Sequence, residues 1–175
     1  MRRLLKFLHE LGSFGLMGAL ACLLVLNRLS PPPSDLAGYA MMRGAMAEIG
    51  KWVFLPSFAF TLIPGLLAIA VNRAFHNAGW AWVKAATGIL VFMGGLHALA
   101  PIQEEARLSA EALAGRLDPA TINGPDVNEQ GTFWMLLIIS VANIVLAIWR
   151  PRLTRLRARR PDPVPQAATA GESAD

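Results

Sequence analysis

The chain contains a single cysteine, Cys22, and few charged residues. One thiol can form neither a disulfide within the chain nor a cysteine-based metal cluster. Charged residues make up 16% of the sequence, whereas about 25% is usual in soluble domains. The sequence also shows no glycine-rich phosphate-binding loop and no Ser-His-Asp set, so it indicates neither a nucleotide-binding domain of that kind nor a serine hydrolase.

Apolar residues are abundant instead, at 54% of the chain. They gather in four runs, at residues 4–28, 51–72, 81–101 and 132–150. A helix needs about 20 apolar residues to cross a bilayer, and each run has about that length. The sequence therefore predicts an all-α, polytopic membrane protein in which residues 1–151 form a bundle of four transmembrane helices.

The segments between the runs refine this architecture. Residues 1–6 and 19–21 resemble parts of a signal peptide, but the apolar run continues past them, so a retained first helix is expected. Residues 36–51 predict a short helix leading into the second span. Residues 103–117 are rich in Ala, Glu and Leu and predict that helix three extends outside the bilayer. The tail, residues 152–175, is basic at first and then has a composition typical of disorder.

The distribution of Lys and Arg predicts the orientation. Basic residues precede the first run, occur between the second and third, and follow the fourth, whereas most acidic residues lie in the other two loops. The positive-inside rule then places both termini in the cytoplasm. The expected location is a bacterial inner membrane. The net charge of +4 is thus read as a topology signal, with anionic headgroups rather than nucleic acid as the partner of the C-terminal arginines. Those arginines are Arg150, Arg152, Arg155, Arg157, Arg159 and Arg160.

Small residues line parts of two predicted helices. Gly15 and Ala19 stand four residues apart in the first helix, and Gly88, Gly94 and Gly95 lie in the third. Small side chains let helix backbones approach closely. We therefore expect residues 12–19 and 88–95 to face each other; the alternative is that these faces leave volume for a flat ligand inside the bundle.

A few polar side chains lie within the apolar runs and are the candidate site residues. Such groups are costly at membrane depth and usually have a partner or a function. His9 and Glu10 in the first run and Lys84 in the third lie at similar depth near the cytoplasmic ends, so they can form one site. His97 is 13 residues from Lys84, about 20 Å along a helix, and belongs elsewhere. Asn143 lies within the fourth run.

Each of these residues also has a purely structural interpretation. His9 and Asn143 can form hydrogen bonds with neighbouring helices, and Lys84 can extend its ammonium group to the headgroups. Glu10 can pair with a nearby lysine. His97, near the outer interface, is more typical of a structural residue. The methionines form no Met-x-Met or His-Met cluster, so no metal site is assigned.

Several short motifs resemble a known family. Lys6-Phe-Leu-His9 resembles the K-x-L-H start of the HemJ-type protoporphyrinogen oxidases and of the related membrane proteins near the copper-resistance D family. The second helix of that group runs P…T-x-x-x-G-L, and Pro56 with Thr61-Leu-Ile-Pro-Gly65-Leu is similar to it. Trp80-Ala-Trp-Val-Lys84, then His97, resembles W-x-x-V-K…H. Asn128-Glu129, ending at Trp149-Arg-Pro151, resembles an N-E…K-P ending.

The resemblance implies a four- to five-helix bundle in which His9 and Lys84 help to hold a haem b or another porphyrin. The oxidases carry Tyr-x-Pro-Arg just after their first helix, where this chain has Asn27-Arg28-Leu29. The oxidase activity therefore does not follow from the resemblance. The hypotheses that remain are a haem-associated, redox-active membrane protein, a non-catalytic accessory or scaffold subunit in a homo- or hetero-oligomer, and a transporter.

Overall fold

The computed structural model describes residues 2–71, 79–125 and 128–149, which form helices joined by turns. No strand occurs in these residues, so the predicted all-α fold is confirmed. The predicted tail, the loop around Arg73 and the last residues of the second and fourth spans lie outside the described residues. In chain order the elements are α1 (Arg2–Leu29), α2 (Leu36–Ile49), the π-helical segment η1 (Gly50–Phe54), α3 (Leu55–Val71), α5 (Gly79–Leu113), the 3₁₀ helix η2 (Pro119–Thr121) and α6 (Glu129–Trp149).

Four helical stretches are long and apolar enough to cross a membrane: Arg3–Leu29, Leu36–Val71, Gly79–Leu113 and Glu129–Trp149. The predicted four-helix membrane bundle is therefore confirmed. α5 has 35 residues, which at 1.5 Å per residue gives a length of about 52 Å. The hydrocarbon layer is about 30 Å thick, so the charged C-terminal part of α5 extends beyond it, as the sequence predicts.

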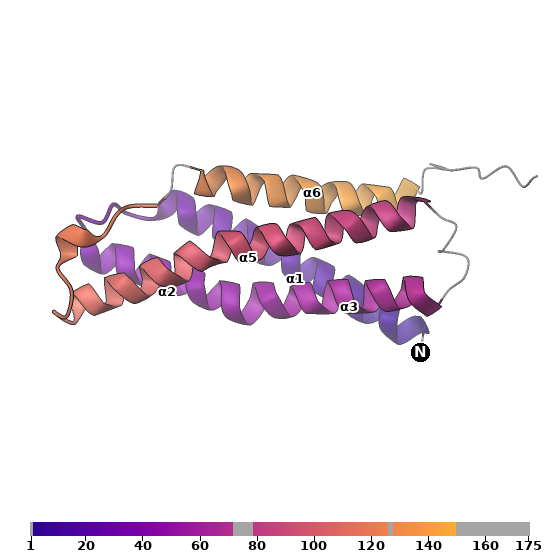
Figure 1. The fold of residues 1–175 in the computed structure, drawn as a ribbon, viewed down its shortest axis with the longest axis horizontal. Helices are drawn as coiled ribbons and strands as arrows, with labels where there is room; N and C mark the ends of the chain where they lie inside the picture. Colours follow the sequence, from indigo (N-terminus) through magenta and orange to yellow (C-terminus); the bar gives the residue numbers. More distant parts are fainter. Residues whose placement is uncertain (1, 72–78, 126–127, 150–175) are drawn as a thin grey trace, which may run out of the picture.

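The helices form one elongated bundle, with the N-terminus and the end of α6 at the same end (Figure 1). α1 packs chiefly along α3 and against α6, whereas α5 packs on α2 and α6 and less extensively on α3. We call the end with the first residues of α1 and the last residues of α6 the His9 end. The opposite end, which contains α2 and the second half of α5, is the Arg43 end.

The small-residue faces meet partners other than those expected. Gly12 of α1 lies against the backbone of α3: a Cβ atom at Gly12 would stand 2.6 Å from the Ser57 carbonyl oxygen and the Thr61 nitrogen. On α5, Gly95 lies against the ring of Phe54 in η1. The prediction that residues 12–19 face residues 88–95 is therefore wrong. Close approach does occur, but between α1 and α3, which follow each other as antiparallel neighbours in the bundle.

The apolar core is concentrated away from the His9 end. Among the described residues, α1 has no buried residue before Gly12, α3 none after Pro64 and α6 none after Ser140. The first part of α5 has only Ala81 buried before Val91. The His9 end is therefore loosely packed. The buried apolar core consists of Leu16, Ala19, Leu20, Leu23, Leu24, Met46, Phe54, Phe58, Val91, Ala98, Leu99, Ile102, Phe133 and Leu136.

A π-helical segment joins α2 to α3 without interrupting the helix. Pro56 lacks an N–H group, and its ring crowds the carbonyl group of Trp52 one turn earlier. In η1 the Leu55 N–H donates to the Gly50 carbonyl, five residues back. Local π geometry accommodates a proline in a membrane helix by rearranging these backbone bonds. As a result α2, η1 and α3 form one continuous rod, so the predicted short helix does lead into the second span.

Candidate functional site

His9 contacts the backbone of α3 at the loosely packed end of the bundle. Its side chain is half-buried, and Nδ1 lies 2.7 Å from the carbonyl oxygen of Thr61. Gly65 leaves room for the ring, because a Cβ atom there would be 3.2 Å from Nδ1. Pro64 provides no N–H for the Phe60 carbonyl and disturbs the helix turn that also contains Thr61, and side chains from neighbouring helices commonly bond backbone carbonyls in such turns. His9 thus links α1 to α3 by a hydrogen bond.

This contact also fixes the tautomer of His9. A carbonyl oxygen can only accept, so Nδ1 must carry the proton that it donates to Thr61. In the neutral imidazole Nε2 then holds the lone pair. Histidines that bind metal ions commonly use this arrangement, in which a backbone carbonyl orients the ring and the other nitrogen is the ligand.

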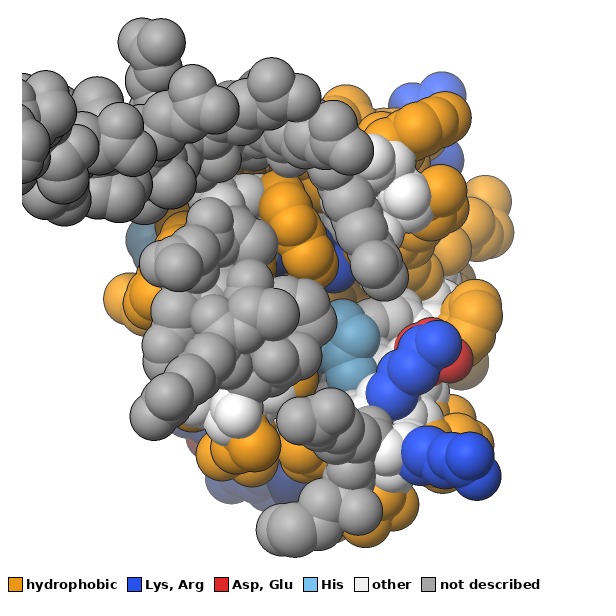
Figure 2. Space-filling view, turned by 90° about the vertical axis from the view of Figure 1, so that its right-hand side faces the viewer, with side chains coloured by type: hydrophobic (Ala, Val, Ile, Leu, Met, Phe, Trp, Pro, Cys, Tyr) orange, Lys and Arg blue, Asp and Glu red, His pale blue; other side chains and the backbone are white. Residues whose placement is uncertain are grey.

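Lys84 and two further polar residues lie on the helices across from His9. Lys84 is half-buried in the first turns of α5, which begins at the His9 end (Figure 1). One turn further along α5, the Thr87 hydroxyl lies 2.6 Å from Oδ1 of Asn143 on α6, to which it donates. Figure 2 looks onto this end and shows a histidine and basic side chains among apolar ones. The structure therefore brings His9 and Lys84 together at one end, with Asn143 bonded to α5.

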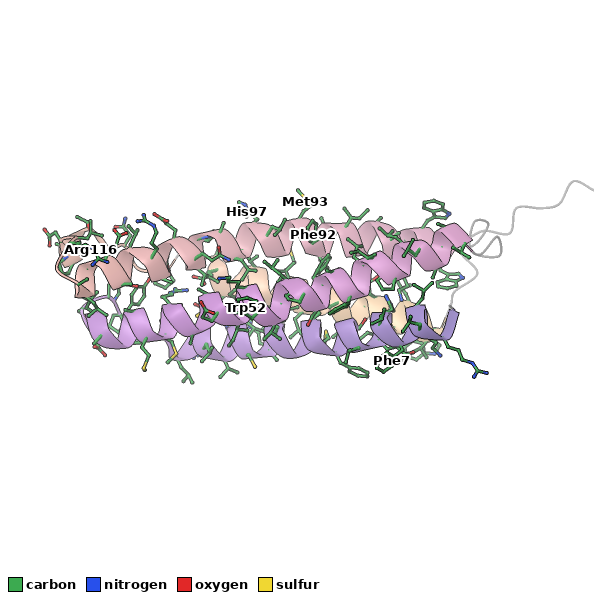
Figure 3. The ribbon with its side chains drawn as sticks, turned by 90° about the horizontal axis from the view of Figure 1, so that it is seen from below. Phe7, Trp52, Phe92, Met93, His97 and Arg116 are labelled. Carbon is green, nitrogen blue, oxygen red and sulfur yellow. The ribbon has the colours of Figure 1, made fainter. Side chains whose placement is uncertain are left out.

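Two of the predicted site residues are not part of this group. Glu10 is exposed and pairs with Lys6, its Oε1 lying 3.6 Å from Nζ. The expectation that Glu10 joins His9 and Lys84 in one cluster is therefore wrong. His97 lies on the outward-facing side of α5, away from the His9 end (Figure 3). The sequence prediction that His97 and Lys84 serve different places agrees with this arrangement.

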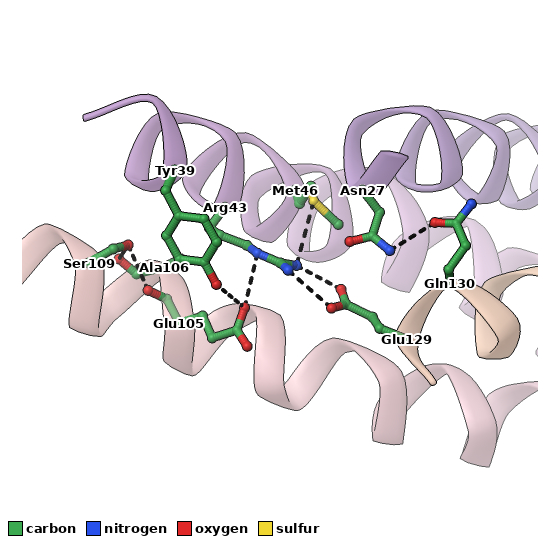
Figure 4. A network of polar contacts seen from close by, with 9 residues as sticks. All are labelled: Asn27, Tyr39, Arg43, Met46, Glu105, Ala106, Ser109, Glu129 and Gln130. Atoms are coloured by element: carbon green, nitrogen blue, oxygen red, sulfur yellow. Dashed lines mark hydrogen bonds and ion pairs between the residues drawn. The ribbon is translucent and has the colours of Figure 1, made fainter. Parts of the chain in front are cut away.

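The most extensively buried polar group was not predicted (Figure 4). Arg43 of α2 is 0% exposed. Its guanidinium binds Glu129 of α6 through two contacts, Nη1 to Oε1 at 2.7 Å and Nη2 to Oε2 at 3.1 Å. Its Nε lies 3.0 Å from Oε2 of Glu105 on α5. The hydroxyl of Tyr39, one turn before Arg43, donates to the same oxygen at 2.9 Å.

These four residues, Tyr39, Arg43, Glu105 and Glu129, are called the arginine cluster below. They connect α2, α5 and α6. The Cζ atom of Arg43 lies over the Tyr39 ring, 5.3 Å from the ring centroid. The sequence analysis placed Arg43 and both acids in the outside loops, and it singled out Glu129 only as part of the Asn128-Glu129 motif. The signal that was available is the spacing of Tyr39, Arg43 and Met46, which places an aromatic, a cation and an apolar side chain on one helix face.

Neither end contains the usual elements of a metal cluster, because no three His, Cys, Asp or Glu side chains come together as metal ligands among the described residues. Among the described residues, the candidate site at the His9 end is formed by the His9 imidazole, the Lys84 ammonium group and their polar neighbours. Such a set can hold an amphipathic ligand that brings its own metal or its own negative charges.

Comparisons with protein-family models, with curated proteins and with solved structures find no match to this chain.

Proposed function

We propose that this small multi-pass membrane protein binds a tetrapyrrole, haem b in the first instance, at the His9 end of its bundle. The observation that carries the proposal is the hydrogen bond from His9 Nδ1 to the Thr61 carbonyl at 2.7 Å, which leaves Nε2 as the ligand atom. The sequence resemblance to the HemJ-type group points to the same residue. A bound haem supplies one-electron redox chemistry, and the protein tunes it through ligand and environment.

The residues at this end fit such a ligand. The helices bury few side chains here, so a flat apolar ring can enter between them with little loss of existing packing. Lys84 supplies a positive charge for a propionate group near the aqueous boundary, where a charged lysine costs least. Thr87 and Asn143 provide hydrogen-bonding groups on the opposite wall. The close contact of Gly12 with α3 excludes the ligand from the middle of the α1–α3 interface.

The first prediction tests haem binding directly. Ferric haem b is titrated into the full chain purified in detergent, and the absorption spectrum is recorded. We expect a Soret band that saturates at one haem per chain, and we expect His9→Ala to abolish it because the axial ligand is lost. Lys84→Met should weaken binding about tenfold, as expected when one charge-assisted contact worth about 1.5 kcal/mol is removed.

The matched control for His9→Ala is His97→Ala, which removes the exposed imidazole on the outward-facing side of α5. Its spectrum should equal that of the unmodified protein. A protein that remains colourless in excess haem, or a Soret band that survives in His9→Ala, would overturn the proposal.

A scaffold role is the second candidate, and the arginine cluster favours it. Three helices are fixed to one another by buried ion pairs at the Arg43 end, an arrangement that rigidifies a bundle without needing a ligand. In this alternative His9 only seats α1 on α3, and the protein is an accessory subunit in a larger assembly. Failure of the haem titration would leave this candidate in place.

The topology is part of the proposal. We propose that the chain lies in a bacterial inner membrane, as its resemblance to the HemJ-type group suggests. We place both termini in the cytoplasm, because basic residues precede the first span, lie between the second and third and follow the fourth, whereas most acidic residues lie in the other two loops. The C-terminal arginines then lie beside anionic headgroups.

The second prediction checks this orientation in intact cells. In a Cys22→Ser background, cysteines introduced at Ser34 and Thr121 should react with a membrane-impermeant maleimide, because both residues are exposed at the Arg43 end. A cysteine introduced at Ser173 should react only after the cells are opened. Labelling of Ser173→Cys in intact cells, without labelling at the other two positions, would reverse the orientation.

A further inference from the structure

The arginine cluster holds unequal numbers of positive and negative groups. Arg43 carries one positive charge, while Glu105 and Glu129 bring two carboxylates. Arg43 is 0% exposed at its side chain, and the exposed fractions of the Glu129 and Glu105 side chains are 5% and 17%. With both acids ionised, the cluster therefore contains one uncompensated negative charge that is largely shielded from water. An uncompensated buried charge is costly, and the usual response is uptake of a proton.

The two carboxylates are held differently. Both oxygens of Glu129 lie against the guanidinium, in a bidentate pair that favours the ionised form. Glu105 uses only Oε2, which accepts from the Tyr39 hydroxyl at 2.9 Å and lies 3.0 Å from Arg43 Nε, an ion-pair contact without hydrogen-bond geometry. Both of these contacts are available to the carbonyl oxygen of a neutral carboxyl group. Figure 4 shows the second oxygen of Glu105 pointing away from Arg43, where it can carry a proton.

The other charged groups on the packed elements do not balance the cluster. On α5, Arg107 pairs with Glu104 and Glu111 at 2.6 Å and 2.7 Å, and these side chains are a third or more exposed. Near η2, Asp118 accepts from the Ala120 N–H. At this end of the bundle the remaining charged side chains of the described residues are exposed, and they are Arg28 on α1, Asp35 before α2, Glu48 on α2, Lys51 on η1 and Arg116 after α5. The half-buried Lys84 of α5 lies at the opposite end.

We propose that the arginine cluster is a proton-binding site in which Glu105 carries one proton at neutral pH. In this state Arg43 and Glu129 form a neutral pair, and the Glu105 carboxyl group is uncharged. Release of the proton to solvent, through the exposed edge of Glu105, leaves a carboxylate and one net negative charge inside the cluster. The site is at the opposite end of the bundle from His9, so it does not depend on haem binding.

The sign of the pH dependence follows from proton linkage. If the folded protein binds a proton on Glu105 that the unfolded chain has already released, raising the pH favours unfolding. For one proton, the unfolding equilibrium constant rises about tenfold per pH unit until Glu105 ionises in the folded state as well. Stability of the full chain in mixed micelles should therefore fall between neutral and alkaline pH.

The experiment uses the infrared absorption of protonated carboxyl groups in the purified full chain. At neutral pH we expect a carboxyl band that disappears on raising the pH and is absent in Glu105→Gln. Glutamine resembles the protonated acid, so this variant should also lose the pH dependence of unfolding and exceed the unmodified protein in stability at alkaline pH. Glu104→Gln is the matched control, because it removes the neighbouring exposed acid, and it should retain both the band and the pH dependence.

Two outcomes would overturn the proposal. One is the absence of a protonated carboxyl band from the unmodified protein at neutral pH, a measurement that does not require any variant to fold. The other is a band that persists in Glu105→Gln but disappears in Glu129→Gln, which would place the proton on the acid bound to the guanidinium.

Discussion

Replacement of Arg43 by alanine should prevent the protein from accumulating in a folded form. The change leaves Glu105 and Glu129 without their shared cation in a site where the Arg43 side chain is 0% exposed. Breaking a buried ion pair by removing one partner typically costs about 3–5 kcal/mol, a large part of the stability of a small domain. The measurement is the yield of monodisperse protein in detergent, followed by its thermal unfolding.

The control and the rescue use the same network. Arg107→Ala removes an arginine that also contacts two acids, but on the exposed surface of α5, and it should leave yield and unfolding nearly unchanged. Adding Glu105→Gln and Glu129→Gln to an Arg43→Met protein removes all the charges and should restore much of the yield, because neutral groups can replace buried ion pairs. An Arg43→Ala protein as stable as the unmodified one would contradict the role assigned to the cluster.

Replacement of Gly12 by leucine should separate α1 from α3. A Cβ atom at this position would stand 2.6 Å from the Ser57 oxygen and the Thr61 nitrogen and 2.7 Å from the Phe60 carbonyl carbon. All three are backbone atoms, so the clash can be relieved only by moving a whole helix. We expect a loss of about 3 kcal/mol or more, together with loss of the His9 contact to Thr61. Thermal unfolding in detergent and the haem titration would report both effects.

Gly18→Leu is the matched control for Gly12→Leu. Both glycines lie within α1, so the change in helix propensity is the same, but a Cβ atom at Gly18 meets nothing within 4 Å. Its leucine would lie on the exposed, lipid-facing side of the helix. Equal effects of the two substitutions would show that α1 and α3 are not in close contact.

Hydrophobicity and length predict the architecture from the sequence, because the bilayer imposes both on each helix. The partners of each helix are harder to predict. The glycines of α1 indicated that the backbone of another helix packs closely against it, but a face of small residues can accommodate α3 as well as α5. Antiparallel neighbours joined by a short loop are the commoner arrangement, and here the order of the chain was a better guide than the similarity of the two small-residue faces.

At the His9 end, the depth of a residue could be predicted but its direction could not be read from depth alone. His9 and Glu10 are consecutive, so their side chains point about 100° apart on the helix. When His9 faces α3, Glu10 must turn away, and it pairs with Lys6 one turn earlier. Lys84 and Asn143 depend on the rotation of α5 and α6, which the packing of the whole bundle determines.

The arginine cluster could not be predicted from local sequence. Arg43 and Glu129 are 86 residues apart along the chain, and Tyr39 and Glu105 are 66 apart. The positive-inside rule treats loop charges as topology signals and assumes that they are solvated. That assumption fails here because α2, α5 and the start of α6 pack against one another and bury these charges between them.

The π-helical segment determines which way Arg43 faces. Side chains that face the bundle interior recur every three or four residues along the α2–α3 rod. From Tyr39 to Phe58, a uniform α-helix would rotate these positions away from the interior by roughly 100°. The one extra residue accommodated in η1 absorbs the drift. Deleting any single residue from 50–54 would therefore rotate α2 relative to α3 and carry the guanidinium away from both acids, although every residue of the cluster would still be present. The inward positions are Tyr39, Arg43, Met46, Gly50, Phe54 and Phe58.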